Sequence, residues 1–194
     1  MQTTIPPMPR LKHLATAAPL ALVVVACGQA ATKATSTAAA KTHRSTAAQS
    51  CPTSGLAVWL GLGEGGATAG STYYPLELTN VSHRTCTLFG FPGVSAVRGR
   101  QLGSAAGRDH ARPTQRVTLA PGETAHAILR IVDVANYPSA RCGQANASGL
   151  RIYPPNQRAA AEIPFAFRAC SRSGPVYLSV RAVEPGVGVP GHSD

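Results

Sequence analysis

The sequence predicts an all-β protein: an Ig-like antiparallel β-sandwich of about seven to nine strands, placed after a signal peptide and a flexible linker. Short segments rich in Val, Ile, Leu and aromatic residues recur at even spacing after residue 50, and Gly or Pro separates them. Apolar residues in these segments tend to alternate with period two, whereas helical periodicity is scarce. Residues 51–184 have the length of one ordinary domain.

Residues 1–26 have the features of a bacterial lipoprotein signal peptide. Arg10 and Lys12 form a basic start, and an uncharged, mostly apolar stretch covers residues 14–26. This stretch is too short to cross a membrane as a helix, but it suits the core of a signal peptide. Cys27 directly follows Val-Val-Ala, which matches a lipobox, so we expect a diacylglycerol on its sulfur.

Lipidation of Cys27 decides where the protein is expected to act. Two or more acyl chains hold a protein stably on a membrane. We therefore expect the domain at the outer face of the cytoplasmic membrane, in the cell envelope, where disulfides form. The alternative is an ordinary secretory signal that is cleaved after Ala26 and leaves a free thiol. Met8 opens a shorter signal peptide and is an alternative start.

Residues 27–50 are predicted to be the lipidated cysteine and a flexible linker rich in Ala, Thr and Ser. After Cys27 the segment has no apolar side chain larger than that of alanine, so it cannot bury enough surface to offset the entropy of ordering. As a flexible chain, its 23 residues span roughly 25–30 Å. We expect a solvated tether.

The predicted strands follow the linker. In residues 73–80, Tyr74, Leu76 and Leu78 lie on one side of the strand. Between two strands, Pro121-Gly122 suits a type II turn. The tail, residues 185–194, is predicted to be disordered. The strand segments are 55–62, 73–80, 116–134 (two strands), 150–154, 162–167 and 176–183.

Five cysteines are present, so at least one is outside any intramolecular disulfide. With Cys27 lipidated, the other four allow three pairings. We favour Cys51 with Cys86 and Cys142 with Cys170. Because no C-x-x-C occurs, a thiol-redox enzyme is not expected.

The segment 78–94, LTNVSHRTCTLFGFPGV, is the most specific stretch of the chain. Here the sequence resembles the actinobacterial secreted and lipoprotein domain catalogued as domain of unknown function 4232. The resemblance covers about residues 51–184. The matching positions are Cys51, Gly70-Ser71, Thr79-Asn80, Cys86-Thr87-Leu88, Gly90-Phe91-Pro92-Gly93-Val94 and Leu119-Ala120-Pro121-Gly122, and later Cys142 and Cys170. The resemblance implies a secreted Ig-like β-sandwich that is usually tethered to the membrane, and it implies no known activity and no catalytic residues.

The residues point to little catalytic chemistry. Motifs of serine hydrolases, zinc proteases and phosphate-binding loops are missing. The nearest approach to a metal or base pair is Asp109-His110, which we expect in a solvated turn, and His83 and His126 are isolated in the sequence. We therefore expect a non-enzymatic binding or interaction domain without metal or cofactor. An envelope enzyme whose active site is assembled from loops is the alternative.

The charge balance gives the one positive indication of a partner. The chain has 18 basic and 8 acidic residues, and every basic residue after Cys51 is arginine. Arginine pairs bidentately with phosphate and carboxylate, so we expect contact with anionic cell-wall polymer or lipid headgroups. Nucleic acid is not an expected partner, because few aromatic residues interleave the arginines. Five of these arginines fall within 19 residues of a Gly-rich loop: Arg98, Arg100, Arg108, Arg112 and Arg116.

Replacement of Cys27 tests the anchor. We expect Cys27→Ser to move the protein from the detergent-soluble membrane fraction to the aqueous or secreted fraction, because the variant has no thiol to acylate. Fractionation followed by immunoblotting measures the shift. Mass spectrometry of the wild-type protein that finds an unmodified Cys27 contradicts this expectation.

Overall fold

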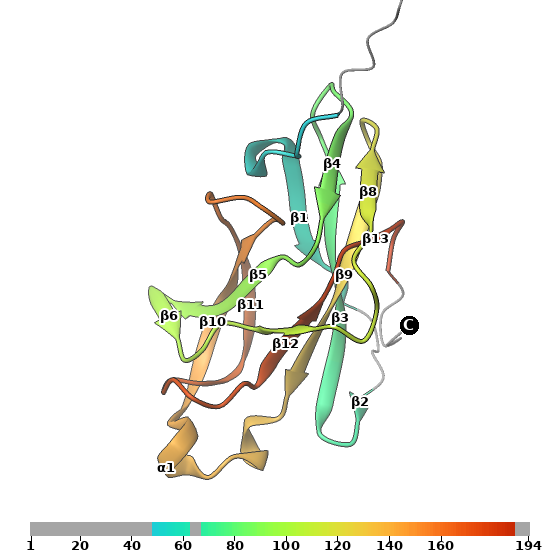
Figure 1. Cartoon of the computed structure of the whole chain (residues 1–194). Helices are drawn as coiled ribbons and strands as arrows, with labels where there is room; N and C mark the ends of the chain where they lie inside the picture. The colour runs from blue at the N-terminus through green and yellow to red at the C-terminus, as the bar shows by residue number, and fades with distance from the viewer. Residues whose placement is uncertain (1–47, 63–66, 189–194) are drawn as a thin grey trace, which may run out of the picture. The chain divides into compact units, whose positions relative to one another are not determined.

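The computed structural model describes residues 48–62 and 67–188, which form a β-rich domain (Figure 1). The expected signal peptide, Cys27, most of the linker and residues 189–194 lie outside these ranges. The prediction of an all-β fold is confirmed, because the helical elements are short: two 3-10 turns (Thr53–Gly55 and Val134–Asn136) and helix α1 (Ser139–Cys142). Within the described ranges, no helix has the length and apolar character needed to cross a membrane. The strands are β1 (Leu56–Leu60), β2 (Ala67–Thr68), β3 (Ser71–Asn80), β4 (Cys86–Phe89), β5 (Gly93–Arg98), β6 (Arg100–Leu102), β7 (Gly107–Asp109), β8 (Arg116–Leu119), β9 (Thr124–Val132), β10 (Gln144–Tyr153), β11 (Ala161–Cys170), β12 (Leu178–Arg181) and β13 (Glu184–Pro185).

The strands form two main sheets and a separate ladder (Figure 1). The first sheet has the order β1–β3–β9–β12–β7, with β2 paired to β3 and β13 paired to β9. The second has the order β11–β10–β5–β6, and β4 pairs with β8 alone. Named strands run antiparallel to their neighbours except β7, which runs parallel to β12. Several strands of two or three residues raise the number above the seven to nine that we expected.

The core lies between the two sheets, and the alternation of side chains in β3 shows how the sequence builds it. Leu76 and Leu78 are fully buried, and Leu76 pairs with Leu60 of β1. Across the sandwich, the ring of Tyr74 meets the ring of Phe165 of β11 edge-on, with centroids 5.2 Å apart. Burial of one such leucine contributes about 2 kcal/mol. The predicted inward face of this strand is therefore correct.

The described part of the chain contains two disulfides, and they are the pairs that we favoured. Cys51 and Cys86 have Cα atoms 4.9 Å apart, and Cys142 and Cys170 have Cα atoms 4.6 Å apart. They join positions separated by 35 and 28 residues, so each restricts a long stretch of the unfolded chain. The first joins the start of the domain to β4, and the second joins α1 to the end of β11.

Both predicted ends of the domain need correction. The linker was placed up to Ser50, but Gln49 already accepts a hydrogen bond from the Thr87 N–H (2.8 Å), and Ser50 bridges to Thr87. Residues 48–50 therefore belong to the domain, because their backbone polar groups pair with β4. The tail was predicted to be disordered from residue 185, and this is wrong for residues 185–188.

Residues 184–188, which we call the C-terminal strap, begin as β13 in the first sheet and then cover part of its outer face at Gly188. The strap pairs with β9 and turns at Gly186, whose φ of 84° suits glycine. Gly188 then lies against Pro75 and His126. A Cβ atom at Gly188 would stand 2.5 Å from the Pro75 Cβ, so only glycine fits this place. The sequence signal that was taken for disorder, a Gly- and Pro-rich tail, instead permits this close approach.

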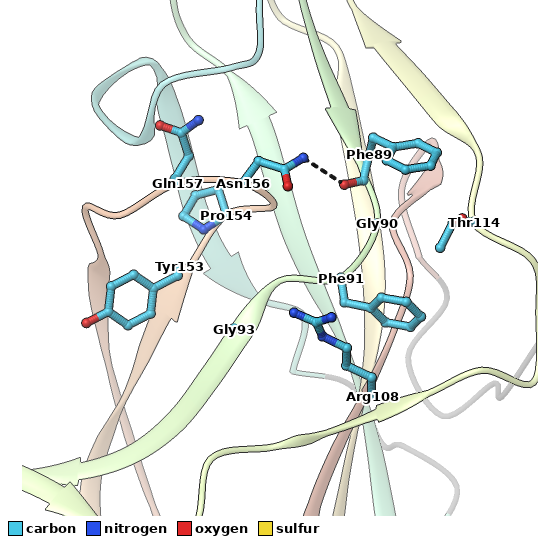
Figure 2. A pocket seen from close by; sticks show the side chains of 10 residues that line it. All are labelled: Phe89, Gly90, Phe91, Gly93, Arg108, Thr114, Tyr153, Pro154, Asn156 and Gln157. Carbon is cyan, nitrogen blue, oxygen red and sulfur yellow. Dashed lines mark hydrogen bonds between the residues drawn. The ribbon is translucent and has the colours of Figure 1, made fainter.

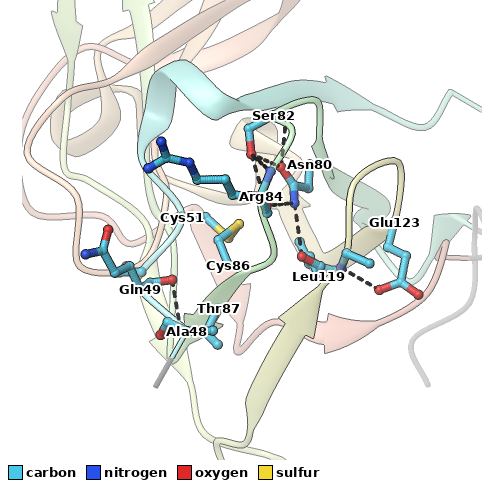
Figure 3. Close-up of a disulfide and its surroundings, with 12 residues drawn as sticks. Ala48, Gln49, Cys51, Asn80, Ser82, Arg84, Cys86, Thr87, Leu119 and Glu123 are labelled. Atoms are coloured by element: carbon cyan, nitrogen blue, oxygen red, sulfur yellow. Dashed lines mark hydrogen bonds between the residues drawn. A yellow bond between two sulfur atoms is a disulfide. The ribbon is translucent and has the colours of Figure 1, made fainter. Parts of the chain in front are cut away.

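Asn80, at the end of β3, joins several turns (Figure 3). Its side chain is buried with no exposed surface. The Nδ2 group donates to the carbonyls of Arg84 (2.9 Å) and Leu119 (3.0 Å). The Oδ1 atom accepts from the Ser82 N–H (3.0 Å) and from the Ser82 hydroxyl (2.7 Å). One carboxamide thus satisfies four polar groups.

The backbone of Asn80 holds the next turn as well. Its N–H donates to the Glu123 carbonyl (2.8 Å), and its carbonyl accepts from the Gly122 N–H (2.7 Å). Glu123 N–H also donates to the Ala120 carbonyl (3.0 Å), and Gly122 has a φ of 85°. These values fit the type II turn predicted at Pro121-Gly122.

We expect Asn80→Ala to lower the free energy of unfolding by about 3–4 kcal/mol, because several buried polar groups lose their partners. Chemical denaturation with both disulfides oxidised measures the change. Ser82→Ala is the matched control, since it removes only the hydroxyl from this network and should cost about 1 kcal/mol. Equal losses in the two variants would contradict the central role of the carboxamide.

Candidate binding groove

The five arginines of the predicted anion-binding loop do not share one loop. Arg98 ends β5, Arg100 begins β6, Arg108 lies in β7 and Arg116 begins β8, so only Arg112 lies in a connection. The prediction of a single Gly-rich loop is wrong because β6, β7 and β8 each pair with a different strand: β5, β12 and β4. Backbone pairing distributes the charges over the domain.

Two of the five, Arg98 and Arg100, belong to the β5–β6 hairpin and are called the hairpin arginines. They are paired with each other in the β5–β6 ladder, and Arg98 Nη1 donates to the Asn146 carbonyl (3.2 Å). Figure 1 shows β6 at one edge of the domain, well separated from β8. The hairpin arginines therefore cannot act at the same place as Arg116.

Two other charged residues of the segment 98–116, Arg112 and Asp109, form ion pairs. Arg112 Nε lies 3.9 Å from Glu184 of the C-terminal strap. Asp109 Oδ2 lies 3.4 Å from Arg181 Nε. The His110 ring instead contacts the Phe91 ring, with the two planes tilted by 58°. The expected solvated turn at Asp109-His110 is wrong for Asp109, because this residue belongs to β7. In residues 48–62 and 67–188, no three His, Cys, Asp or Glu side chains gather into a metal-binding group.

A groove of about 500 Å³ lies where β4 ends and β5 begins (Figure 2). Its two walls are the motif segment 90–93 and the turn at residues 154–157. Asn156 Nδ2 joins the walls by donating to the Phe89 carbonyl (3.2 Å). Gly90 and Asn156 have φ values of 94° and 61°, which suit glycine and asparagine. The lining residues are Phe89, Gly90, Phe91, Gly93, Arg108, Thr114, Tyr153, Pro154, Asn156 and Gln157.

Arg108 supplies the positive charge of the groove. Its Cζ atom lies 5.7 Å from the centroid of the Phe91 ring, and the His110 ring is 4.7 Å from the same centroid. A cation–π contact fixes the side chain without using its N–H donors. Among the described residues, no carboxylate forms an ion pair with Arg108. Figure 2 shows its guanidinium directed into the groove, toward the carboxamide of Asn156.

Arg116 places a second charge beside the groove. It pairs with Phe89 in the β4–β8 ladder, and its Cζ atom lies 5.7 Å from the Phe89 ring centroid. The Phe89 side chain is 44 % exposed, so ring and guanidinium meet at the surface. Arg108 and Arg116 are called the groove arginines.

A second hollow, of about 770 Å³, lies beside the Cys51–Cys86 disulfide (Figure 3). Its lining includes Ser82, whose hydroxyl already serves the Asn80 network, and the exposed side chain of His83. It is also lined by Arg84 and Pro52, but among the described residues no Phe or Tyr side chain lines it. The groove at Phe91 therefore differs from this hollow by placing its arginine against an aromatic ring.

A family model described as a domain of unknown function (DUF4232) matches residues 51–184, which is more than half of the chain. The chain belongs to the DUF4232 family. No curated protein matches the chain. The resemblance inferred from the 78–94 segment is thus confirmed, and the family description names no activity.

The motif positions that indicated DUF4232 have distinct structural roles. Asn80 of the Thr79-Asn80 pair makes the buried hydrogen bonds described above. The Thr79 hydroxyl is hydrogen-bonded to the Thr124 hydroxyl (2.8 Å). Residues 90–93 of the motif form one wall of the groove. Sequence reasoning missed the opposite wall, residues 154–157. Its Pro-Pro-Asn-Gln composition is typical of a turn, but only the fold brings that turn to Phe89.

A buried acid in this DUF4232 domain also escaped sequence reasoning. The β3–β9 register places Glu77 directly opposite His126, which had looked isolated. Glu77 has no exposed surface; its Oε1 accepts from the Gly188 N–H (2.9 Å), and its Oε2 has no hydrogen-bond partner in the described ranges. The His126 Nδ1 atom lies 3.0 Å from the Gly186 carbonyl oxygen. Both side chains thus face the C-terminal strap.

Burial raises the pKa of Glu77, and the hydrogen bond from Gly188 and the nearby His126 only partly offset this effect. A raised pKa means that the folded domain binds more protons than the unfolded chain. The contribution of Glu77 to stability is therefore fully present below the unfolded pKa of about 4.5 and is lost as the pH rises through the folded pKa.

We expect Glu77→Gln to flatten the decline in stability above pH 4.5, because glutamine does not ionise. Thermal unfolding midpoints of wild type and variant, measured from about pH 4.5 to about pH 8, test this expectation. Glu162→Gln is the control, since this side chain is exposed and pairs with Arg151 at the surface. A Glu77→Gln variant that loses stability as steeply as wild type would show that another group is responsible.

Proposed function

We propose that the protein is a lipid-anchored, extracytoplasmic binding protein without enzymatic activity. Its β-sandwich would hold anionic groups of the cell envelope, phosphate or carboxylate, at the groove arginines. The anchor is inferred from the sequence around Cys27, and the location is the outer face of the cytoplasmic membrane. Neither a cofactor nor nucleic acid is part of this proposal.

The proposal depends mainly on the guanidinium of Arg108. Most charged groups near it have partners, because Arg112 pairs with Glu184 and Asp109 lies beside Arg181. Arg108 instead rests on Phe91 and keeps its N–H donors for an external anion. Phosphate and carboxylate groups accept two parallel N–H bonds from such a fork. A charge that is fixed in place and left without a carboxylate is typical of a binding site.

The position of the groove agrees with a role near the membrane. Gln157 in the groove wall donates to the Ser50 hydroxyl (3.2 Å), so the groove lies close to the start of the domain. A tether that begins at Cys27 would hold it within tens of ångströms of the membrane surface. At that distance weak binding is sufficient, because tethering raises the effective concentration of the partner.

The alternative of an envelope enzyme receives less support. The carboxylate with a raised pKa, Glu77, is the kind of group that active sites use. It is, however, fully buried, and the C-terminal strap covers it. In the part of the chain that the structure describes, no carboxylate and no histidine lines the groove itself. A binding role thus uses the accessible groups better than a catalytic role does.

Exchange of the groove arginines tests the proposed function. We expect full-length protein with Cys27→Ser to be retained on purified cell wall or anionic vesicles at low salt and released at high salt, because exposed ion pairs are weak and screened. Arg108→Ser combined with Arg116→Ser should lower retention by about tenfold, if each pair contributes up to about 0.7 kcal/mol. Quantitative co-sedimentation measures the bound fraction.

The hairpin arginines provide the matched control. Arg98→Ser combined with Arg100→Ser removes the same charge at a distant edge and should change retention less than about twofold. Equal losses in the two double variants would mean that net charge alone causes binding. No retention of the parent protein at low salt would refute the proposed function.

A further inference from the structure

The groove offers hydrogen-bond donors on one residue, Arg108, and a hydrogen-bond acceptor on another, Asn156. Asn156 uses its Nδ2 group on the Phe89 carbonyl, and Gln157 uses its Nε2 group on the Ser50 hydroxyl. In the part of the chain that the structure describes, nothing donates to the two carboxamide oxygens. The Gln157 carboxamide is turned away from Arg108 (Figure 2). The Asn156 oxygen remains to accept a hydrogen bond from a ligand in the groove, whereas Arg108 can only donate.

A bare anion does not suit this arrangement. Phosphate and carboxylate oxygens bind the Arg108 guanidinium, but they repel the Asn156 oxygen that faces it across the groove (Figure 2). The Asn156 oxygen needs a donor such as a hydroxyl. A ligand that fits both sides therefore carries an acidic group and hydroxyls within a few ångströms of each other.

The apolar surface of the groove adds a third requirement. Phe91 and Tyr153 are half-buried and line the groove together with Pro154. Ligand sites combine such apolar walls with a few polar groups that fix orientation. A volume of about 500 Å³ has room for more than one sugar ring. The C–H faces of sugar rings are apolar, and their edges carry hydroxyls.

We infer that the groove binds an acidic saccharide, a sugar ring that carries a phosphate or carboxylate beside free hydroxyls. Arg108 would hold the acidic group, Asn156 would accept from a neighbouring hydroxyl, and the ring would lie against Phe91 or Tyr153. This inference rests on the proposed function and narrows it. A flat lipid surface fits less well, because Arg108 and the Asn156 oxygen line opposite sides of a groove.

Four probes separate the components of recognition. Polygalacturonate has carboxylates and hydroxyls, polyphosphate has charge without hydroxyls, dextran has hydroxyls without charge, and phosphatidylserine vesicles present charge without hydroxyls on a lipid surface. We expect full-length protein with Cys27→Ser to bind polygalacturonate at least tenfold more tightly than each of the other three at low salt. Biolayer interferometry with the immobilised protein measures the affinities.

Two variants assign this binding to the groove. Asn156→Gly tolerates the positive φ and removes the carboxamide, so it should weaken polygalacturonate binding about fivefold. It should not weaken polyphosphate binding, because it also removes the oxygen that repels phosphate. Polyphosphate thereby reports any general damage to the turn. Gly93→Leu fills the groove without removing a polar side chain, since its Cβ would make ordinary contact with Tyr153 at 3.4 Å. It should abolish binding of polygalacturonate.

The outcomes distinguish the saccharide from the anion site in general. If polyphosphate or the vesicles bind as tightly as polygalacturonate, or if Asn156→Gly weakens both polyanions equally, the saccharide inference is overturned while anion binding stands. If no anionic probe binds at low salt, both proposals fail. Tight polygalacturonate binding that survives Gly93→Leu would place the site elsewhere and overturn the inference as well.

Discussion

The buried carboxamide of Asn80 is the interaction on which one end of the sandwich depends. It bonds the turn at Ser82 and Arg84 and the end of β8, and its backbone bonds the turn before β9. The Cys51–Cys86 disulfide lies in the same region and joins the start of the domain to β4. An apolar residue at this position would leave buried backbone groups unpaired, which costs more than a lost contact. The Thr-Asn pair of the family motif thus has a physical reason that needs no ligand.

The groove depends on this scaffold, because it lies between a strand end and a turn from different sheets. The β4–β8 ladder sets Phe89 and Arg116, and the β10–β11 connection brings Asn156 to the same place. Each contact across the groove is a single hydrogen bond or a ring contact. The walls are therefore held by the sheets behind them, as is usual for binding sites on rigid elements. This arrangement explains how an otherwise ordinary sandwich presents an arginine without a carboxylate partner.

The C-terminal strap supplies a hydrogen-bond partner to only one of the two oxygens of the buried Glu77 carboxylate. An acidic side chain in the middle of β3 needs partners once the sheet is covered, and the strap supplies one N–H to Glu77 from Gly188. The second carboxylate oxygen has no partner among the described residues. Burying such a group lowers stability unless it takes up a proton. The strap is held on the sheet chiefly by backbone pairing with β9 and by the close fit of Gly188.

Local pattern was sufficient for the fold class, for the inward face of β3 and for the turn at Pro121-Gly122, because each depends on residues near in sequence. The number of strands was underestimated, since two- and three-residue strands have no periodicity to detect. Arginine spacing in the chain did not predict arginine spacing in space, because strands β6, β7 and β8 pair with three different neighbours. The sequence by itself determined the all-β character and the family of this protein. Only the tertiary structure decided that Arg108 would face Asn156 and that Glu77 would lie opposite His126, since register and sheet order bring together residues that no local rule connects.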